Sequence, residues 1–258
     1  MKYINNHLNS SYLDKKFSGP CVCIGYGKSA IQMRAVPKWK KHFSIACNYA
    51  QSSFPSPIYT YQDRDFVNRS MGFISRYKFF GLPILPTARY VLHNKSLMQT
   101  LQGFFVNRIK HGNRPTWLDS KNSTHLFSSC PISGAVAAGM AYCMGFSPII
   151  IVGYDAEPGS YRYYKRHPIH GSNNSKGMAM WGRSQHNFLK NWGKELGIIN
   201  CSYSSAMEKH ELSDVITDLD DENYGSSCDI LEDIYFKNAK EFGSTAVENF
   251  IKKPRYSR

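Results

Sequence analysis

Small and polar residues follow an apolar stretch near the start of the chain, and their types suit the binding of a phosphate group. Residues 20–24 are apolar and lead into the turn Gly25-Tyr-Gly-Lys-Ser29. The glycines allow close approach of a backbone, Lys28 supplies a cation, and Ser29 can cap a following helix whose amide groups then face an anion. The motif is incomplete, because it is neither a full GxGxxG sequence nor a Walker A loop. It therefore indicates a phosphate-binding turn only together with other features.

A second stretch, residues 131–155, predicts a helix, a tight turn, a buried strand and then an acid. The helix is rich in Gly and Ala and can lie close to a sheet, Ser133 can cap it, and Gly145 is placed to end it. Ile149–Val152 is continuously apolar, which is typical of a strand covered on both faces. Asp155 follows just beyond the carboxyl end of this strand, where open α/β sheets bind their ligands.

A long polar segment comes next. Residues 156–177 show no apolar periodicity and combine tyrosines and histidines with lysine and arginine. Loops longer than about 12 to 15 residues in a compact domain are usually lids, binding loops or disordered segments. We therefore expect a lid-like binding loop here.

The remaining elements predict an α/β fold. Short apolar stretches predict strands, and amphipathic ones predict helices. The predicted strands are residues 43–48, 58–61, 84–86, 89–92 and 198–203, and the predicted helices are residues 101–109 and 178–196. This order favours a Rossmann-like, mostly parallel sheet with flanking helices. We expect a polar lead-in at 1–18, a Rossmann-like domain at 19–206, and an acidic then basic helical segment at 207–258.

Charge is unevenly distributed along the chain. The net charge is +13, and residues 208–258 hold 7 Lys and Arg against 12 Asp and Glu, so the excess of positive charge lies in residues 1–207. Such a basic body attracts phosphates, acidic glycans, nucleic acid or an anionic membrane surface, or it is simply a solvated surface. The acidic segment 208–233 is expected to form exposed helix and loop, or to fold back on the basic face.

Cysteine usage and hydropathy indicate a cytoplasmic protein. The seven cysteines are odd in number and none forms a Cys-x-x-Cys pair, so we expect buried, reduced thiols. The first residues are polar, and no stretch reaches the roughly 18 apolar residues of a membrane span. We expect no metal site, because Asp63-Arg64-Asp65 is better interpreted as a turn. The sequence indicates no oligomeric state.

Four motifs in order carry a resemblance to a known family: Gly25–Ser29, Cys47-Asn48, Ser133-Gly134 and Gly153–Asp155. Together they resemble bacterial sialyltransferases of the Campylobacter type and related Rossmann-like proteins of unknown function, over residues 19–206. The resemblance implies a GT-A-like variant of the fold and a nucleotide-sugar-binding domain at 19–206. It also implies metal-independent sugar transfer from a CMP-sugar, with the nucleotide sugar as co-substrate and no other cofactor. The chain departs from the family at two places. Tyr26 stands where the family has an Asn, and Cys130-Pro131 stands where the family has an Arg.

The resemblance also implies roles for individual residues. A histidine in the loop after Asp155 is the general base, and His170 is the candidate because an unperturbed pKa of about 6.5 suits a proton acceptor; His167 and His186 are alternatives. Asp155, the second candidate catalytic residue, binds a ribose or acceptor hydroxyl, or caps a turn. The expected donor-binding residues are Gly25, Tyr26, Gly27, Lys28, Ser29, Asn48, Ser133, Gly134, Tyr161, Tyr164 (or Tyr163) and Arg166.

Two classes of function follow. The first is a glycosyltransferase that moves a sugar from a CMP- or UDP-sugar to an acceptor hydroxyl, on a glycan or on a modified base of DNA. The second is a Rossmann-like nucleic-acid-binding module without chemistry, which Tyr26 and Cys130 favour. A diphosphate-transferring enzyme of the pterin pyrophosphokinase type is a further alternative, since that group has the same sheet and Ser-Gly helix.

Overall fold

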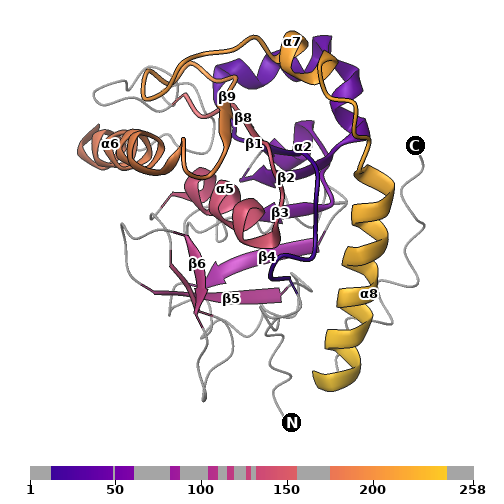
Figure 1. Cartoon of the computed structure of the whole chain (residues 1–258). Coiled ribbons are helices and arrows are strands. Elements are labelled where there is room, and N and C mark those ends of the chain that lie inside the picture. Colours follow the sequence, from indigo (N-terminus) through magenta and orange to yellow (C-terminus); the bar gives the residue numbers. More distant parts are fainter. Residues whose placement is uncertain are drawn as a thin grey trace.

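Nine strands in the described part of the chain form one sheet (Figure 1). The structure is a computed structural model, which describes residues 13–48, 50–60, 82–87, 104–109, 115–118, 126–128, 132–155 and 175–242. The strands lie in the order β6-β7-β5-β4-β3-β2-β1-β8-β9. Their bounds are β1 Cys21–Ile24, β2 Phe43–Cys47, β3 Ile58–Thr60, β4 Leu82–Thr87, β5 Phe104–Ile109, β6 Thr116–Leu118, β7 Leu126–Ser128, β8 Ile149–Val152 and β9 Ile198–Asn200.

Almost all strand pairs are parallel, and only β6 and β7 run antiparallel to each other among the paired strands that the structure describes. The helices are η2 Lys28–Ile31, α1 Gln32–Ala35, η3 Pro37–Lys41, α2 Ala50–Ser53, α5 Ser133–Met144, α6 Ser175–Trp192, α7 Leu212–Thr217 and α8 Tyr224–Phe242. The predicted α/β fold with a Rossmann-like, mostly parallel sheet and flanking helices is confirmed.

The chain reverses its direction across the sheet next to β1. From β1 it proceeds outward through β2 and β3, and after α5 it returns to place β8 on the other side of β1. The register pairs Cys21 with Ile149 and Ile24 with Val152, so β1 and β8 end side by side. In open parallel sheets this reversal is where ligands bind.

Both faces of the central strands are buried, as their continuous apolar sequence predicts. Cys21 and Cys23 contribute to one core cluster, whereas Val22 and Ile24 contribute to the other. The first cluster contains α5, which crosses the sheet in Figure 1, and the second contains residues of η3 and α7. Alternate side chains of a strand point to opposite faces, so one strand supplies both layers.

Helix α5 lies close to the sheet because its side chains are small. Its alanines, at positions 135, 137, 138 and 141, are completely buried. The helix ends at Gly145 as predicted, since this residue adopts a φ of +105°, a conformation that favours glycine. The predicted cap at Ser133 is wrong: Ile132 is the N-cap residue, and Ser133 opens the helix without capping it.

One predicted helix is a strand. Residues 104–109 form β5, which pairs with β4 and β7, where the sequence pattern favoured a helix over 101–109. A short apolar run fits the periodicity of a helix and that of a strand equally well. Pairing with two neighbouring strands makes this run a strand. The strand expected at 89–92 lies outside the described residues, and so does most of the lid-like loop expected at 156–177.

Residues 13–18 pack on the body, although a loose lead-in was expected from their polarity. Leu13 and Phe17 are buried, and the Phe17 ring stacks on Phe146 with centroids 5.0 Å apart. The Phe17 amide donates to the Met144 carbonyl over 2.9 Å. These contacts tie the segment to the end of α5.

The acidic C-terminal segment folds back on the basic face, which was one of the two expected arrangements. The Lys41 ammonium pairs with the Glu222 carboxylate at 2.5 Å, and the Lys38 ammonium donates to the Thr217 carbonyl over 3.2 Å. Buried His42 places its Nδ1 3.0 Å from the Asp221 carbonyl oxygen. Part of the charge of η3 is therefore neutralised within the molecule.

The residues that the structure describes include most of the cysteines and several helices, which bear on the expected burial of the thiols and on membrane spans. Six cysteines there are free, and all but Cys228 are buried. Over the same residues, no helix combines the length and apolar character that a membrane crossing requires.

Asn223 joins the C-terminal segment to the sheet, and its removal tests how much this contact stabilises the fold. Its side chain accepts from the Phe43 amide (2.9 Å) and donates to the Ser18 and Pro20 carbonyls (2.8 and 2.9 Å). We expect Asn223→Ala to lower the free energy of unfolding by about 2 to 4 kcal/mol in urea denaturation, because buried polar groups lose their partners. Glu222→Ala is the control, since its ion pair is half-exposed and should contribute little. Equal stabilities would contradict the interpretation.

Candidate functional site

The turns after β1 and β8 touch each other through their backbones. The Gly25 amide donates to the Val152 carbonyl over 2.7 Å, and the Gly27 amide donates to the Gly153 carbonyl over 2.9 Å. A methyl group on Gly27 would lie 2.5 Å from the Asp155 Oδ2, and one on Gly25 would collide with the Gly153 carbonyl. The glycines of this motif are therefore required by the contact between the two turns.

The Asp155 carboxylate connects the loops after β1, β8 and β9 through hydrogen bonds. Only 3% of the residue is exposed, and its Oδ2 accepts from the Ser29 amide over 2.7 Å. Its Oδ1 accepts from the Ser29 hydroxyl over 2.5 Å and from the Tyr203 amide over 3.0 Å. The Ser29 hydroxyl in turn accepts from the Gly153 amide over 2.8 Å. The carboxylate thus holds the ends of β1, β8 and β9 in fixed positions.

These contacts favour a positioning role for Asp155. The sequence left open whether this acid binds a hydroxyl or caps a turn after Gly153, and its hydrogen bonds show instead that it joins Ser29 and Tyr203 in two other loops. The expected cap by Ser29 is wrong, because η2 has Gly27 as its N-cap and the Ser29 hydroxyl bonds to the carboxylate. The catalytic role of Asp155 stays a prediction.

Two further predicted residues, Asn48 and Ser133, contact each other at the end of β2, the strand next to β1. Asn48 follows β2 with a φ of +51°, and its backbone N–H donates to the Thr60 carbonyl over 3.0 Å. The Ser133 hydroxyl donates to the Asn48 Oδ1 over 3.2 Å. Asn48 is half-buried and Ser133 is buried, so the pair presents an amide at the surface of the same sheet edge.

Tyr154 holds the start of α5 in place, and the sequence analysis missed it. Its buried hydroxyl donates to the Gly134 carbonyl over 2.8 Å, and a methyl group on Gly134 would lie 2.6 Å from its ring. The Cys47 thiol lies 3.9 Å from the same hydroxyl. Burial raises the pKa of the Tyr154 hydroxyl and of the Cys47 thiol well above their usual values. Both groups therefore stay protonated at neutral pH and act in packing rather than as nucleophile or base.

Exposed aromatic and cationic side chains surround these buried contacts. Tyr26 is 46% exposed and Tyr203 is 45% exposed, and Lys28 is exposed at the start of η2. The Lys209 ammonium lies 5.4 Å from the centre of the Tyr203 ring. Tyr203 was not among the predicted residues, and its position after the last strand of the sheet, β9, is the signal that could have found it.

The structure thus brings together the predicted residues Gly25, Tyr26, Gly27, Lys28, Ser29 and Asp155 in one group, and Asn48, Ser133 and Gly134 in an adjacent one. The expected base His170, its alternative His167, and the tyrosines and arginine of the loop lie outside the described residues, as do Cys130 and Asp63. His186 is described, and it lies half-buried on α6. Among the described residues, no three His, Cys, Asp or Glu side chains are grouped so as to hold a metal ion.

Comparison with known proteins shows a similarity of fold. No protein-family model matches the chain, and no curated protein matches it. The structure of MAf glycosyltransferase from Magnetospirillum magneticum AMB-1 is similar, with a TM-score of 0.55 and 13% sequence identity. The similarity covers 93% of this chain and 42% of that one, so this chain spans less than half the length of its structural neighbour. The protein is therefore an α/β protein with a glycosyltransferase-like fold, and the comparison does not extend to a Campylobacter-type sialyltransferase.

Removal of the Asp155 carboxylate tests how much its hydrogen bonds stabilise the fold. We expect Asp155→Ala to lower the free energy of unfolding by about 3 kcal/mol, because the buried donors of Ser29 and Tyr203 lose their acceptor. Chemical denaturation measures this loss. Exposed Asp220 offers a matched control, and Asp220→Ala should leave stability near that of the parent. An Asp155→Ala protein as stable as the control would show that the three loops are held by other contacts.

Proposed function

We propose that this chain is a glycosyltransferase, which moves a sugar from a CMP- or UDP-sugar to an acceptor hydroxyl. The observation that carries the proposal is the edge where β1 and β8 end, at the reversal of strand order. Exposed Tyr26 and Lys28 lie in the turn after β1, which the Asp155 carboxylate holds in place, and the Asn48–Ser133 pair lies at the end of the neighbouring strand β2. The similarity in fold to a glycosyltransferase supports this choice among nucleotide-binding functions.

The exposed residues match the parts of a nucleotide sugar. The Lys28 ammonium suits the phosphate of the donor, and positive charge near that phosphate stabilises the leaving nucleotide as its bond breaks. The Asn48 amide suits the hydrogen-bonding groups of the ribose or the base. The ring of Tyr26 offers a face on which a base can stack.

Transfer requires one proton acceptor. The acceptor oxygen forms a bond to the anomeric carbon of the sugar while the bond from that carbon to the donor phosphate oxygen breaks. The proton of the acceptor hydroxyl goes to the base, for which we propose His170, and the nucleotide leaves with the electron pair of the broken bond. Cationic side chains meet the charge of the departing phosphate, so the proposed mechanism needs no metal ion.

The acceptor is proposed to be a glycan or a modified nucleic-acid base. Two exposed tyrosines near the same edge, Tyr26 and Tyr203, favour an acceptor with planar groups, because bases stack on aromatic side chains. The positive net charge of +13 favours an anionic acceptor of either kind.

Nucleotide binding is the first test. We expect CMP or UDP to raise the melting temperature, and we expect neither GDP nor ADP to do so. A ligand that binds only the folded state stabilises it by about 2.7 kcal/mol at 100 times its Kd. Lys28→Ala should reduce the shift by weakening the contact with phosphate. Lys40→Ala, at an exposed lysine of η3, is the control and should retain the shift.

Two results would count against the proposal. If no nucleotide or nucleotide sugar shifts the melting temperature, the chain does not bind a donor. If it is then retained on DNA at low salt and released at high salt, the binding module without chemistry is the better interpretation.

The second test separates donor binding from transfer. We expect His170→Ala to abolish nucleotide release from the donor in the presence of acceptor, while the thermal shift by the nucleotide remains that of the parent. His167→Ala and His186→Ala are measured in parallel, because these two histidines are the alternative bases. Undiminished turnover in His170→Ala would remove it from this role.

A further inference from the structure

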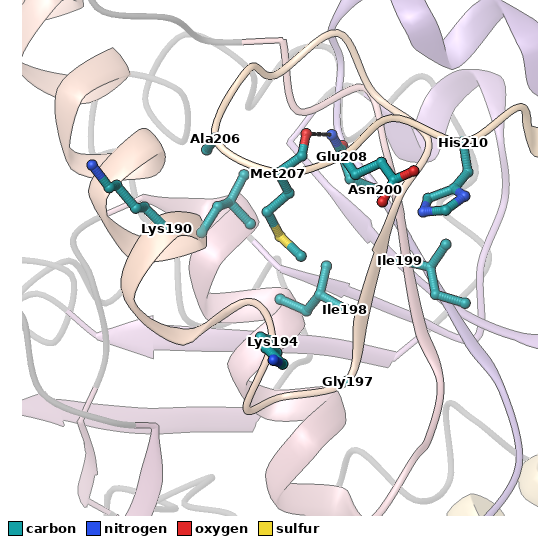
Figure 2. A pocket seen from close by; sticks show the side chains of 11 residues that line it. Lys190, Lys194, Gly197, Ile198, Ile199, Asn200, Ala206, Met207, Glu208 and His210 are labelled. Carbon is teal, nitrogen blue, oxygen red and sulfur yellow. Dashed lines mark hydrogen bonds between the residues drawn. The ribbon is translucent and has the colours of Figure 1, made fainter.

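A pocket of 480 Å³ lies beside the edge strand β9, between the end of α6 and residues 206–210 (Figure 2). Its volume is within the range of about 300 to 1,000 Å³ that is typical of sites for small molecules. The apolar part of its lining includes Leu189, Ile198 and Met207. In Figure 2 the Met207 side chain points into the middle of the lining, toward Ile198. This pocket therefore offers an apolar surface to the body of a ligand.

The rim of the pocket is predominantly basic. Lys190, Lys194 and His210 line it together with one acid, Glu208, and all four residues are exposed. Neither lysine forms an ion pair or a side-chain hydrogen bond within the part of the chain that the structure describes. Two exposed ammonium groups beside an apolar surface favour a ligand that carries negative charge.

The pocket is separate from the candidate donor site, and the loop after β9 runs from one to the other. Asn200 lines the pocket, and its amide donates to the carbonyls of Ser204 (3.0 Å) and Met207 (3.3 Å). Its carbonyl oxygen accepts from the Ser202 amide over 3.0 Å, one residue before the Tyr203 that is bound to Asp155. The wall of the pocket is thus held in a defined shape by the loop that carries Tyr203.

We propose that this pocket is a second ligand site, which binds a small organic anion with an apolar body. The apolar surface around Ile198 and Met207 takes the body of the ligand, and the ammonium groups of Lys190 and Lys194 attract its charged group. The proposal does not depend on sugar transfer, because the lining residues differ from those of the donor site.

The test uses 8-anilinonaphthalene-1-sulfonate, a fluorescent probe with an apolar ring system and one negative charge, on the full chain. We expect saturable binding, weakened about tenfold in the variant K190E/K194E, which corresponds to about 1.4 kcal/mol. The control is K16E/K40E, which changes the net charge equally at two exposed lysines outside the pocket and should bind as the parent does. Circular dichroism and melting curves confirm that each variant is folded.

Two further measurements locate the bound probe. The neutral analogue N-phenyl-1-naphthylamine should bind the parent and K190E/K194E equally, since it has no charge to lose. Ala206→Trp, which fills the pocket from its lining, should weaken both probes. Equal affinity of the anionic probe for the parent, K190E/K194E and Ala206→Trp would overturn the proposal. The nucleotide-dependent thermal shift, measured in the same proteins, should be unchanged in K190E/K194E, so the two proposals fail or succeed separately.

Discussion

One buried carboxylate decides the geometry of the sheet edge where β1, β8 and β9 end. Asp155 accepts hydrogen bonds from the Ser29 amide and hydroxyl and from the Tyr203 amide, which offsets the cost of its burial. Loops that share one carboxylate must approach each other closely, and this explains the glycines at positions 25, 27 and 153. The glycine pattern from which the sequence analysis predicted a phosphate-binding turn is therefore required by packing, because the contact between the loops needs a backbone without side chains.

The same constraint determines which side chains face the solvent. Ser29 points inward to the carboxylate, while Tyr26 and Lys28 in the same turn are exposed. On the next strand, Tyr154 fixes the start of α5 through the Gly134 carbonyl, and this contact sets the place of the Asn48–Ser133 pair. A buried layer of hydrogen bonds thus presents a polar and aromatic outer layer, which is the arrangement expected of a preorganised binding site.

The fold also redistributes the basic charge that dominates the sequence. Lys41 is paired with Glu222 and Lys38 is bound to a carbonyl of the C-terminal segment, so these cations of η3 are engaged within the molecule. Lys190 and Lys194 at the pocket are exposed and form no ion pair among the residues that the structure describes. Net charge alone therefore overstates how much of the basic body is available to an anionic partner, and the positions of the exposed lysines are more informative.

The sequence by itself determined the local elements: the buried strands β1 and β8, the helix α5 with its end at Gly145, and the acid beyond β8. These follow from neighbouring residues, through apolar runs, small side chains and backbone preferences. Only the tertiary structure decided that residues 104–109 form a strand, and that Ser29 and Tyr203 both bond to Asp155. Ser29 lies 126 residues from Asp155 in the chain, and such a partner is selected by strand order rather than by local pattern.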